Sequence, residues 1–325
     1  MKAATYSEYG PPDVVQISDV EKPVPGNDEV LIKVRAASVN PADWHLMRGQ
    51  PYVFRMMMGG LRRPKVTRLG IDVAGQVEAV GRNATQFKPG DQVFGSCRGA
   101  FAEYACTSQS NLAMKPDNVT FEQAASVPVA ALTALQGLRN KGQIQPGQRV
   151  LINGAAGGVG TFAVQIAKWL GADVTGVCST RNVDMVRSIG ADRVIDYTRQ
   201  DFTKSEQRYD LIFDLAASGS LLACRRVLNP KGIYIGAGPA PGASMIGVIV
   251  RWITAATVLS RLVSQKFVIF VTRSTKADLT TLHELMKAGK VKPVIDRCYG
   301  LSETAEAIRY LEQGHARGKV VITLQ

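Results

Sequence analysis

The pattern of hydrophobic and polar positions changes once along the chain. Up to about residue 125, apolar and polar residues alternate in short runs separated by Gly and Pro, as in EVLIKVRAASV, DVAGQVEAVG and GDQVFG. Alternation with a period of two predicts strands joined by turns. Residues 1–125 are therefore expected to form a mainly β domain.

After Pro128, apolar runs with the spacing of strands alternate with apolar runs with the spacing of helices. RVLING, ADVTGVC, RVIDY, YDLIFDLAA and GIYIGAG are typical of buried strands, and VGTFAVQIAKWLG, NVDMVRSIG and SLLACRRVL between them have helical spacing. Such alternation predicts a doubly wound parallel sheet. We assign residues 126–272 to this second domain.

The end of the chain has a third pattern. KADLTTLHELMKAGK and SETAEAIRYLEQG predict two amphipathic helices that flank the strand KPVID, and GKVVITL closes the chain as a strand. Residues 273–325 are expected to return to the first domain.

The segment 242–271 is apolar but is interrupted by Arg251, Arg261 and Lys266. These charges are too closely spaced for a helix that spans a bilayer. An amphipathic helix in peripheral contact with a membrane is one interpretation. The favoured alternative is an apolar helix packed at an interface between subunits or domains.

Composition supports two packed domains, because 46% of the 325 residues are hydrophobic. The formal net charge of +12 is compatible with nucleic acid, an anionic surface or a phosphorylated small molecule. The densest basic group, Arg62, Arg63, Lys65 and Arg68, lacks the interleaved aromatic residues of a groove for single-stranded nucleic acid. We therefore expect no nucleic-acid partner.

The five cysteines stand far apart and form no CxxC pair. This spacing indicates a reducing compartment rather than a disulfide framework. The first ten residues, MKAATYSEYG, contain no apolar core of a signal peptide and no Arg/Ser-rich transit segment. The sequence thus predicts a cytoplasmic protein.

A glycine-rich turn is the clearest candidate for a binding site. The strand-like RVLING ends in small residues and Val at 155–160 and passes directly into a segment with helical spacing. This is the context that a dinucleotide-binding fingerprint requires. Glycines let the backbone approach a pyrophosphate, and the N–H groups and dipole of the helix stabilise its charge. A tight turn without a ligand is the less favoured alternative.

The type of dinucleotide depends on the end of the second strand, about 20 residues further on, where Asp or Glu would hold the ribose 2′-hydroxyl of NAD. This chain has Cys178, Ser179, Thr180 and Arg181 at that place. None of the four is a carboxylate that would repel a 2′-phosphate, and hydroxyls with a guanidinium can bind one. NADPH is favoured over NADH, unless Arg181 is only a solvated charge of the loop.

Several segments together resemble one family. They are SVNPADWHLMRG near residue 40, GIDVAGQVEAVG at 70, KPGDQVFG at 88, VPVAALTALQGL at 127, NGAAGGVG at 153 and GHARGKVVITL at the end. Along essentially the whole chain, the sequence resembles the zeta-crystallin-like quinone oxidoreductases of the medium-chain dehydrogenase/reductase superfamily. The resemblance implies an α/β protein with a GroES-like, mainly β catalytic domain split around a Rossmann domain, an active site in the cleft between them, and a homodimer.

The resemblance also implies roles for individual residues. The glycine turn would cradle the pyrophosphate, and Tyr197, unless it is an ordinary tyrosine at a strand end, would join Ser179 and Arg181 around the 2′-phosphate. Asn40 and Thr133 would lie beside the nicotinamide, and Lys319 would reach into the cofactor cleft. The candidates for NADPH binding are Thr133, Ala156, Gly157, Gly158, Val159, Ser179, Arg181, Tyr197, Gly236 and Lys319.

Ligands for zinc are missing where zinc-dependent relatives have them. Those relatives place a catalytic Cys where this chain has residues 40–43, and a His-Glu pair where it has Ile71 and Asp72. Their structural zinc lobe needs four closely spaced cysteines, whereas only Cys97 and Cys106 lie near that place. The three histidines are far apart in the sequence. We therefore expect no metal site.

Loss of the zinc ligands changes the expected substrate, because a Lewis acid is what makes alcohol dehydrogenation accessible. Quinones and enones need less help, since a hydride adds to a conjugated carbon and a hydrogen-bond donor stabilises the oxyanion. Tyr52 is our candidate for that donor, with packing on Pro51 as the alternative. Asp43 and His45 could serve instead, although Asp43 could equally be a capping residue. The candidate catalytic residues are Asn40, Tyr52 and Asp43.

Residues 54–70 form an insertion relative to the simplest family members. Its methionines 56 to 58 could accept the apolar tail of an isoprenoid quinone, because Met side chains adapt to irregular shapes, but core packing is the favoured interpretation.

The sequence thus favours a zinc-independent, NADPH-dependent oxidoreductase that transfers a hydride to a quinone or an α,β-unsaturated carbonyl. One alternative is an NADPH-binding sensor or partner platform with little turnover. The other is an alcohol dehydrogenase with residual activity. Fold alone does not decide among them.

Overall fold

The computed structural model describes residues 1–50, 52, 55, 60–216, 220–237 and 263–324. The chain divides into two compact units. Met1–Leu132 and Arg273–Gln325 form one, called here the β-rich unit, and Thr133–Thr272 forms the other, called the parallel-sheet unit. The first division falls after Leu132, within helix α4 (Pro128–Leu135).

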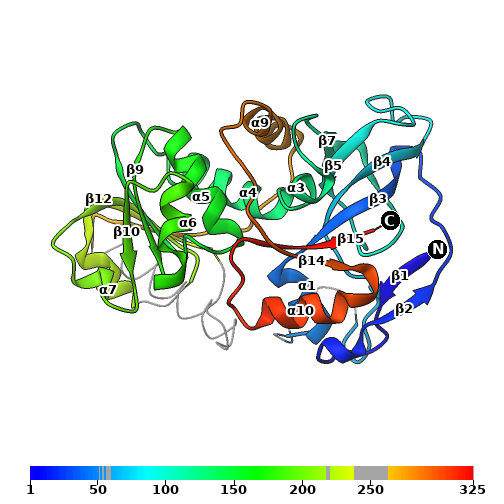
Figure 1. Cartoon of the computed structure of the whole chain (residues 1–325), viewed down its shortest axis with the longest axis horizontal. Helices are drawn as coiled ribbons and strands as arrows, with labels where there is room; N and C mark the ends of the chain where they lie inside the picture. Colours follow the sequence, from blue (N-terminus) through cyan, green and yellow to red (C-terminus); the bar gives the residue numbers. More distant parts are fainter. Residues whose placement is uncertain (51, 53–54, 56–59, 217–219, 238–262, 325) are drawn as a thin grey trace. The chain divides into compact units, whose positions relative to one another are not determined.

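A mixed seven-stranded sheet forms the centre of the β-rich unit (Figure 1). Its strand order is β14-β15-β3-β4-β5-β7, and β6 pairs with β3. The terminal strand β15 lies antiparallel to β3 and parallel to β14, so the end of the chain is built into the first domain. The strands are β3 (Glu29–Val39), β4 (Asp72–Val80), β5 (Gln92–Ser96), β6 (Tyr104–Ser108), β7 (Leu112–Met114), β14 (Ile295–Gly300) and β15 (Lys319–Thr323), and β1 (Lys2–Thr5) pairs with β2 (Gln16–Asp19) separately.

The helices of this unit include the two amphipathic ones predicted near its end, α9 (Lys276–Lys287) and α10 (Thr304–Glu312). Helix α1 (Pro41–Arg48) begins after Asn40, and an ion pair of 2.5 Å between Arg48 and Glu312 joins it to α10. The remaining elements are α3 (Phe121–Ala125) and the 3-10 turns η1 (Pro12–Val14), η2 (Gln109–Asn111) and η6 (Leu301–Glu303).

The parallel-sheet unit contains a six-stranded sheet of order β10-β9-β8-β11-β12-β13, in which all the pairs are parallel. This confirms the predicted doubly wound sheet. The chain reverses its direction of winding between β8 and β11, and in such sheets ligands bind outside the carboxyl ends of the strands at that point. The strands are β8 (Arg149–Asn153), β9 (Asp173–Cys178), β10 (Arg193–Asp196), β11 (Tyr209–Asp214), β12 (Leu228–Gly236) and β13 (Lys266–Ile269).

Helices connect these strands as the apolar spacing predicts. Helix α5 (Gly158–Trp169) follows β8 and is buried along most of its length, and α4 continues into a π-helical turn, η3 (Gln136–Lys141). The other connections are η4 (Thr180–Asn182), α6 (Val183–Ser188), η5 (Phe202–Lys204) and α7 (Leu221–Arg226).

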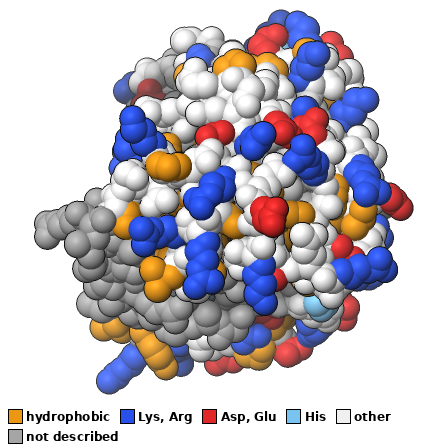
Figure 2. Space-filling model, turned by 90° about the vertical axis from the view of Figure 1, so that its left-hand side faces the viewer, with side chains coloured by type: hydrophobic (Ala, Val, Ile, Leu, Met, Phe, Trp, Pro, Cys, Tyr) orange, Lys and Arg blue, Asp and Glu red, His pale blue; other side chains and the backbone are white. Residues whose placement is uncertain are grey.

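Basic residues are dispersed over the parallel-sheet unit. Arg193, Arg149 and Lys266 are exposed first residues of strands β10, β8 and β13. Figure 2 shows Lys and Arg spread over the side of the molecule on which α7 and β10 lie in Figure 1, with acidic and uncharged groups between them. On this face the positive charge forms no continuous stripe.

The prediction of a membrane contact concerns residues 242–271, of which 242–262 lie outside the described residues. None of the helices in the described ranges has both the length and the apolar character that crossing a bilayer demands.

Candidate functional site

The glycine-rich turn lies between β8 and α5, where the parallel sheet reverses its direction of winding. Gly154 has φ +86°, a conformation that favours glycine, and the N–H groups of Gly154 and Ala155 donate to the carbonyl of Val177 on β9. Gly157 is the N-cap of α5, whose first intrahelical bond runs from Thr161 N–H to Gly157 O at 3.0 Å. The N–H groups of the first turn have no acceptor within the helix and are available to an anion.

Two glycines of this turn have different surroundings. A Cβ at Gly160 would lie 2.1 Å from the carbonyl oxygen of Gly154, so only glycine permits this approach of helix to turn. A Cβ at Gly157 would meet only that same oxygen, at 3.4 Å, and otherwise open space. A tight contact beside an open backbone surface is what the binding of a pyrophosphate requires.

Three buried polar residues, Asn153, Asp214 and Tyr234, form a hydrogen-bonded trio beside the glycine-rich turn. Asp214, at the end of β11, accepts hydrogen bonds from Asn153 Nδ2 at 2.8 Å and from the hydroxyl of Tyr234 at 2.6 Å. Burial, followed by the neighbouring carboxylate, raises the pKa of Tyr234, so its hydroxyl stays a donor. The sequence analysis did not identify this trio, because 20 to 61 positions separate each pair of partners.

The predicted 2′-phosphate site lies where β9 and β10 end together, with Cys178 opposite Asp196. Ser179 and Arg181 follow β9, and Tyr197, 60% exposed, follows β10. The pairing also brings in a carboxylate that the search along the sequence missed. Asp196 accepts hydrogen bonds from Thr180 Oγ1 at 2.5 Å and from Thr198 Oγ1 at 2.8 Å, and these lower its pKa. The carboxylate of Asp196 thus already accepts hydrogen bonds from two threonine hydroxyls.

Two further cofactor candidates lie in the same unit. Gly236 is the last residue of β12 and pairs with Asp214 of β11. The hydroxyl of Thr133, on α4, lies 2.7 Å from the hydroxyl of Thr272. The role of Thr133 beside the nicotinamide and that of Gly236 in cofactor binding stay predictions.

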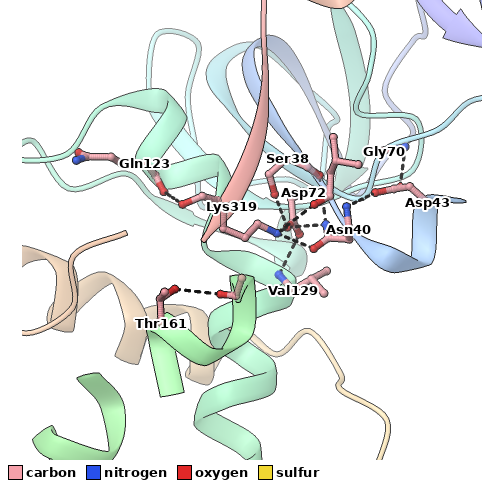
Figure 3. Close-up of polar contacts among 12 residues, drawn as sticks. Ser38, Asn40, Asp43, Gly70, Asp72, Gln123, Val129, Thr161 and Lys319 are labelled. Atoms are coloured by element: carbon pink, nitrogen blue, oxygen red, sulfur yellow. Dashed lines mark hydrogen bonds and ion pairs between the residues drawn. The ribbon is translucent and has the colours of Figure 1, made fainter. Parts of the chain in front are cut away.

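A second group of polar residues is buried in the β-rich unit (Figure 3). Lys319, the first residue of β15, donates from Nζ to Asn40 Oδ1 at 2.7 Å and lies 3.6 Å from Asp72 Oδ2. Asn40 Nδ2 in turn donates to Asp72 Oδ2 at 2.9 Å and to the carbonyl of Ser38 at 3.2 Å. We call these four residues, Ser38, Asn40, Asp72 and Lys319, the lysine cluster.

Asp72 is the centre of the lysine cluster and is fully buried. It also accepts a hydrogen bond from Ser38 Oγ at 2.9 Å and from the N–H of Val129 at 3.0 Å. Burial raises the pKa of Asp72 and lowers the pKa of Lys319, while attraction between the two groups opposes both shifts. The hydrogen bonds and the ion pair favour a carboxylate beside an ammonium.

Asp43 occupies the N-terminal turn of α1. Its carboxylate accepts hydrogen bonds from the N–H groups of Asn40 at 2.7 Å and Gly70 at 3.1 Å, and the side chain is fully buried. These bonds are those of a capping residue, one of the two roles considered for Asp43. Burial raises the pKa of Asp43 to about 7.

This pKa predicts a pH dependence of stability. Because the folded-state pKa of Asp43 lies above its usual value of 3.8, its contribution is fully present below pH 3.8 and is lost as the pH rises through about 7. The wild type should therefore lose stability relative to Asp43→Asn, which cannot ionise, between pH 5 and pH 8. Urea unfolding of both proteins across this range measures the difference between their free energies of unfolding. A difference that does not change with pH would contradict the raised pKa of Asp43.

Tyr52 is 68% exposed, and the guanidinium of Arg55 lies 4.6 Å from the centre of its ring. The alternative of packing on Pro51 and the role of Met56, Met57 and Met58 lie outside the described residues. His45 is mostly buried, and its Nδ1 lies 3.0 Å from the carbonyl of Gln50. Tyr52 is thus the most accessible of the candidate proton donors.

The part of the chain that the structure describes contains no cluster of three or more His, Cys, Asp or Glu residues that could hold a metal ion. Asn40 and Asp72, in the segments where zinc-dependent relatives have ligands, instead lie beside the ammonium of Lys319.

Comparisons with known proteins give matches along almost the whole chain. Residues 26–117 match the alcohol dehydrogenase GroES-like domain family, and residues 189–322 match the zinc-binding dehydrogenase family. The chain is 34% identical to the NADPH-dependent alkenal/one oxidoreductase of Arabidopsis thaliana, over 99% of this chain and 79% of the relative. It is 34% identical to the quinone-oxidoreductase QR1 of Triphysaria versicolor, over 99% and 98%. The structure of the quinone oxidoreductase of Coxiella burnetii is similar, with a TM-score of 0.87 and 30% identity over 100% of this chain and 99% of that one.

Proposed function

Because this chain belongs to the medium-chain dehydrogenase/reductase superfamily, in company with quinone and alkenal/one oxidoreductases, we propose that it is a zinc-independent, NADPH-dependent reductase of quinones or α,β-unsaturated carbonyls. The lysine cluster is the observation that supports zinc independence. The glycine turn is the observation that supports binding of the dinucleotide.

The residues of the parallel-sheet unit fit NADPH. The open backbone at Gly157 and the first turn of α5 would hold the pyrophosphate, and Ser179, Arg181 and Tyr197 would hold the 2′-phosphate. When bound, NADPH supplies the hydride, and the protein supplies binding and orientation. Asp196 lies beside this position as a carboxylate that already accepts hydrogen bonds from Thr180 and Thr198, and Arg199, 3.5 Å away, offsets part of its charge.

Zinc independence is supported by electrostatics at the lysine cluster. The Lys319 ammonium lies within 3.6 Å of both Asn40 Oδ1 and Asp72 Oδ2, in the segments where the zinc-dependent relatives have metal ligands. A divalent cation placed there would be repelled by a buried positive charge. Asn40 is, in addition, a weaker ligand for zinc than the Cys of those relatives.

The chemistry that these residues support is the reduction of a polarised double bond. A hydride adds to the conjugated carbon, the electron pair moves to the carbonyl oxygen, and a proton from a donor or from water completes the reduction. Asn40 and Lys319 are buried and hydrogen-bonded to each other, so we assign them to shaping the site rather than to proton donation. Tyr52 is an exposed residue, and its hydroxyl is our candidate for orienting the substrate oxygen.

Arg181→Ala tests the 2′-phosphate site. Loss of a charge-assisted contact should weaken NADPH binding by about 1 to 3 kcal/mol and leave NADH binding unchanged. Calorimetric titration of both cofactors measures the two affinities. Arg187→Ala, which removes an exposed arginine of α6 outside the proposed site, is the matched control. Equal losses for NADPH and NADH in Arg181→Ala would overturn the assignment.

We also propose a homodimer that forms through the edge of the parallel sheet. Among the described residues, strand β13 is the last strand of the sheet, and Ile269 and Val271, at and beyond its end, are 41% and 86% exposed. An apolar edge strand readily pairs with another chain. Light scattering should give twice the mass of 35.0 kDa, and a monomer would contradict the proposal.

The class of substrate is tested with a panel of acceptors. NADPH consumption is followed at 340 nm with quinones, enones and saturated aldehydes, and NADP⁺ reduction with alcohols. We expect turnover with quinones or enones and none with alcohols. Turnover with alcohols alone would replace this proposal with an alcohol dehydrogenase, and binding of NADPH without turnover on any acceptor would indicate a sensor or partner platform.

A further inference from the structure

Asp72 receives hydrogen bonds from several separate parts of the β-rich unit. Its Oδ2 accepts from Ser38 Oγ and Asn40 Nδ2, which lie at the end of β3, and faces Lys319 on β15. Its Oδ1 accepts from the N–H of Val129 at the start of α4. One carboxylate thus joins β3, β4, β15 and α4, and Figure 3 shows these donors converging on it.

The elements that Asp72 joins carry Asn40 and Thr133, which are expected beside the nicotinamide, and Lys319, which is expected to reach into the cofactor cleft. Asn40 and Lys319 bond or pair with it directly. Thr133 lies four residues after Val129 on the same helix, which is about one helical turn. Resting on the proposed function, we propose that Asp72 is a positioning residue that fixes Asn40, Lys319 and the start of α4 for the nicotinamide end of NADPH.

Asp72 can fix the orientation of the Asn40 side chain because of its hydrogen-bond chemistry. The side-chain amide of Asn40 could point either way in a site that did not distinguish its oxygen from its nitrogen. A carboxylate only accepts hydrogen bonds and an ammonium only donates them. Asp72 on one side and Lys319 on the other therefore permit a single orientation, with Nδ2 toward Asp72 and Oδ1 toward Lys319.

The isosteric variant Asp72→Asn removes this constraint with little change in volume. An amide has one oxygen, so it cannot accept from Val129 N–H on one side and from Ser38 and Asn40 on the other. Its NH₂ group would face another donor, either the N–H of Val129 or the side chains of Asn40 and Lys319. Asn40 is then free to reorient, and Lys319 loses its counter-charge.

The experiment separates the two ends of the cofactor. Calorimetry measures the dissociation constants of NADPH and of 2′-phospho-ADP-ribose, a fragment without nicotinamide, and steady-state kinetics with a quinone gives kcat. In Asp72→Asn we expect the fragment to bind within about twofold of wild type, and kcat or NADPH affinity to fall on the order of 10- to 100-fold, as misplacement of a reacting group by about 1 Å does.

Asp296→Asn is the matched control for a purely structural effect. Asp296 is a half-buried carboxylate of the same unit that accepts hydrogen bonds from the Tyr310 hydroxyl at 2.7 Å and from Arg317 N–H at 2.9 Å. This variant is expected to lower stability without a selective loss at the nicotinamide end.

Two results would overturn the positioning role of Asp72. One is a parallel loss of fragment and NADPH binding in Asp72→Asn, which indicates general damage to the fold. The other is no change in either dissociation constant or in kcat. If the wild type consumes no NADPH with any acceptor, the proposed function fails, whereas the two dissociation constants still decide the role of Asp72.

Discussion

Lys319→Met is expected to destabilise the folded chain by about 3 to 5 kcal/mol at pH 8, the cost of leaving a buried charge without its partner. Lys319 is 3% exposed, and its ammonium is the counter-charge of the fully buried Asp72. The methionine fills similar volume but donates nothing to Asn40 Oδ1. The carboxylate of Asp72 would then rely on Ser38, Asn40 and the N–H of Val129 alone.

The pH dependence of this loss distinguishes a charge effect from a packing effect. Burial already raises the pKa of Asp72, and removal of Lys319 raises it further, so the variant loses stability as the pH rises through the folded-state pKa. Urea unfolding at pH 5 and pH 8 should give the smaller cost at pH 5. The double variant Asp72→Asn/Lys319→Met should recover part of the loss at pH 8. Equal costs at both pH values, with no recovery, would show that packing rather than charge is responsible.

Gly160→Ala is expected to weaken NADPH binding more than tenfold and to cost about 1 to 3 kcal/mol of stability, as overpacking does. The new Cβ would lie 2.1 Å from the carbonyl oxygen of Gly154 and 2.8 Å from Ala155, all backbone atoms that no side-chain rotation can move away. Helix α5 and the glycine turn would have to separate. Thermal unfolding and calorimetric titration of NADPH measure the two effects.

Gly157→Ala is the matched variant for this prediction. Its Cβ would meet only Gly154 O, at 3.4 Å, so the fold should keep nearly all of its stability. The methyl group would nevertheless stand at the N-cap of α5, where the pyrophosphate is proposed to bind, and NADPH binding should weaken. Normal NADPH binding by Gly157→Ala would place the pyrophosphate elsewhere.

Periodicity in the sequence predicted the elements that depend on local pattern. The alternating run EVLIKVRAASV is strand β3 (Glu29–Val39), and RVLING with the helical segment after it forms β8 and α5 around the glycine turn. The strand near KPVID is displaced, since β14 spans Ile295–Gly300 and pairs with β15. Pairing with a neighbour decides strand bounds, and no local pattern records that pairing.

The lysine cluster and the environment of Asp196 could not be predicted from periodicity in the sequence. Asp72 entered the sequence analysis only as a residue that replaces a zinc ligand, because its partners Asn40 and Lys319 lie 32 and 247 positions away. Asp196 lies 16 positions after Thr180 and reaches it only through the pairing of β9 and β10. Polar contacts across a sheet depend on strand order and register, which the sequence patterns did not specify.

Zinc independence is tested by the rate of NADPH oxidation with a quinone or enone acceptor after the protein is treated with a strong chelator. The zinc content is measured on the same sample. We expect full activity at less than about 0.1 zinc per chain, and no gain on addition of zinc, because a buried lysine occupies the region where relatives bind the metal. Activity that disappears with the zinc and returns when zinc is restored would contradict it.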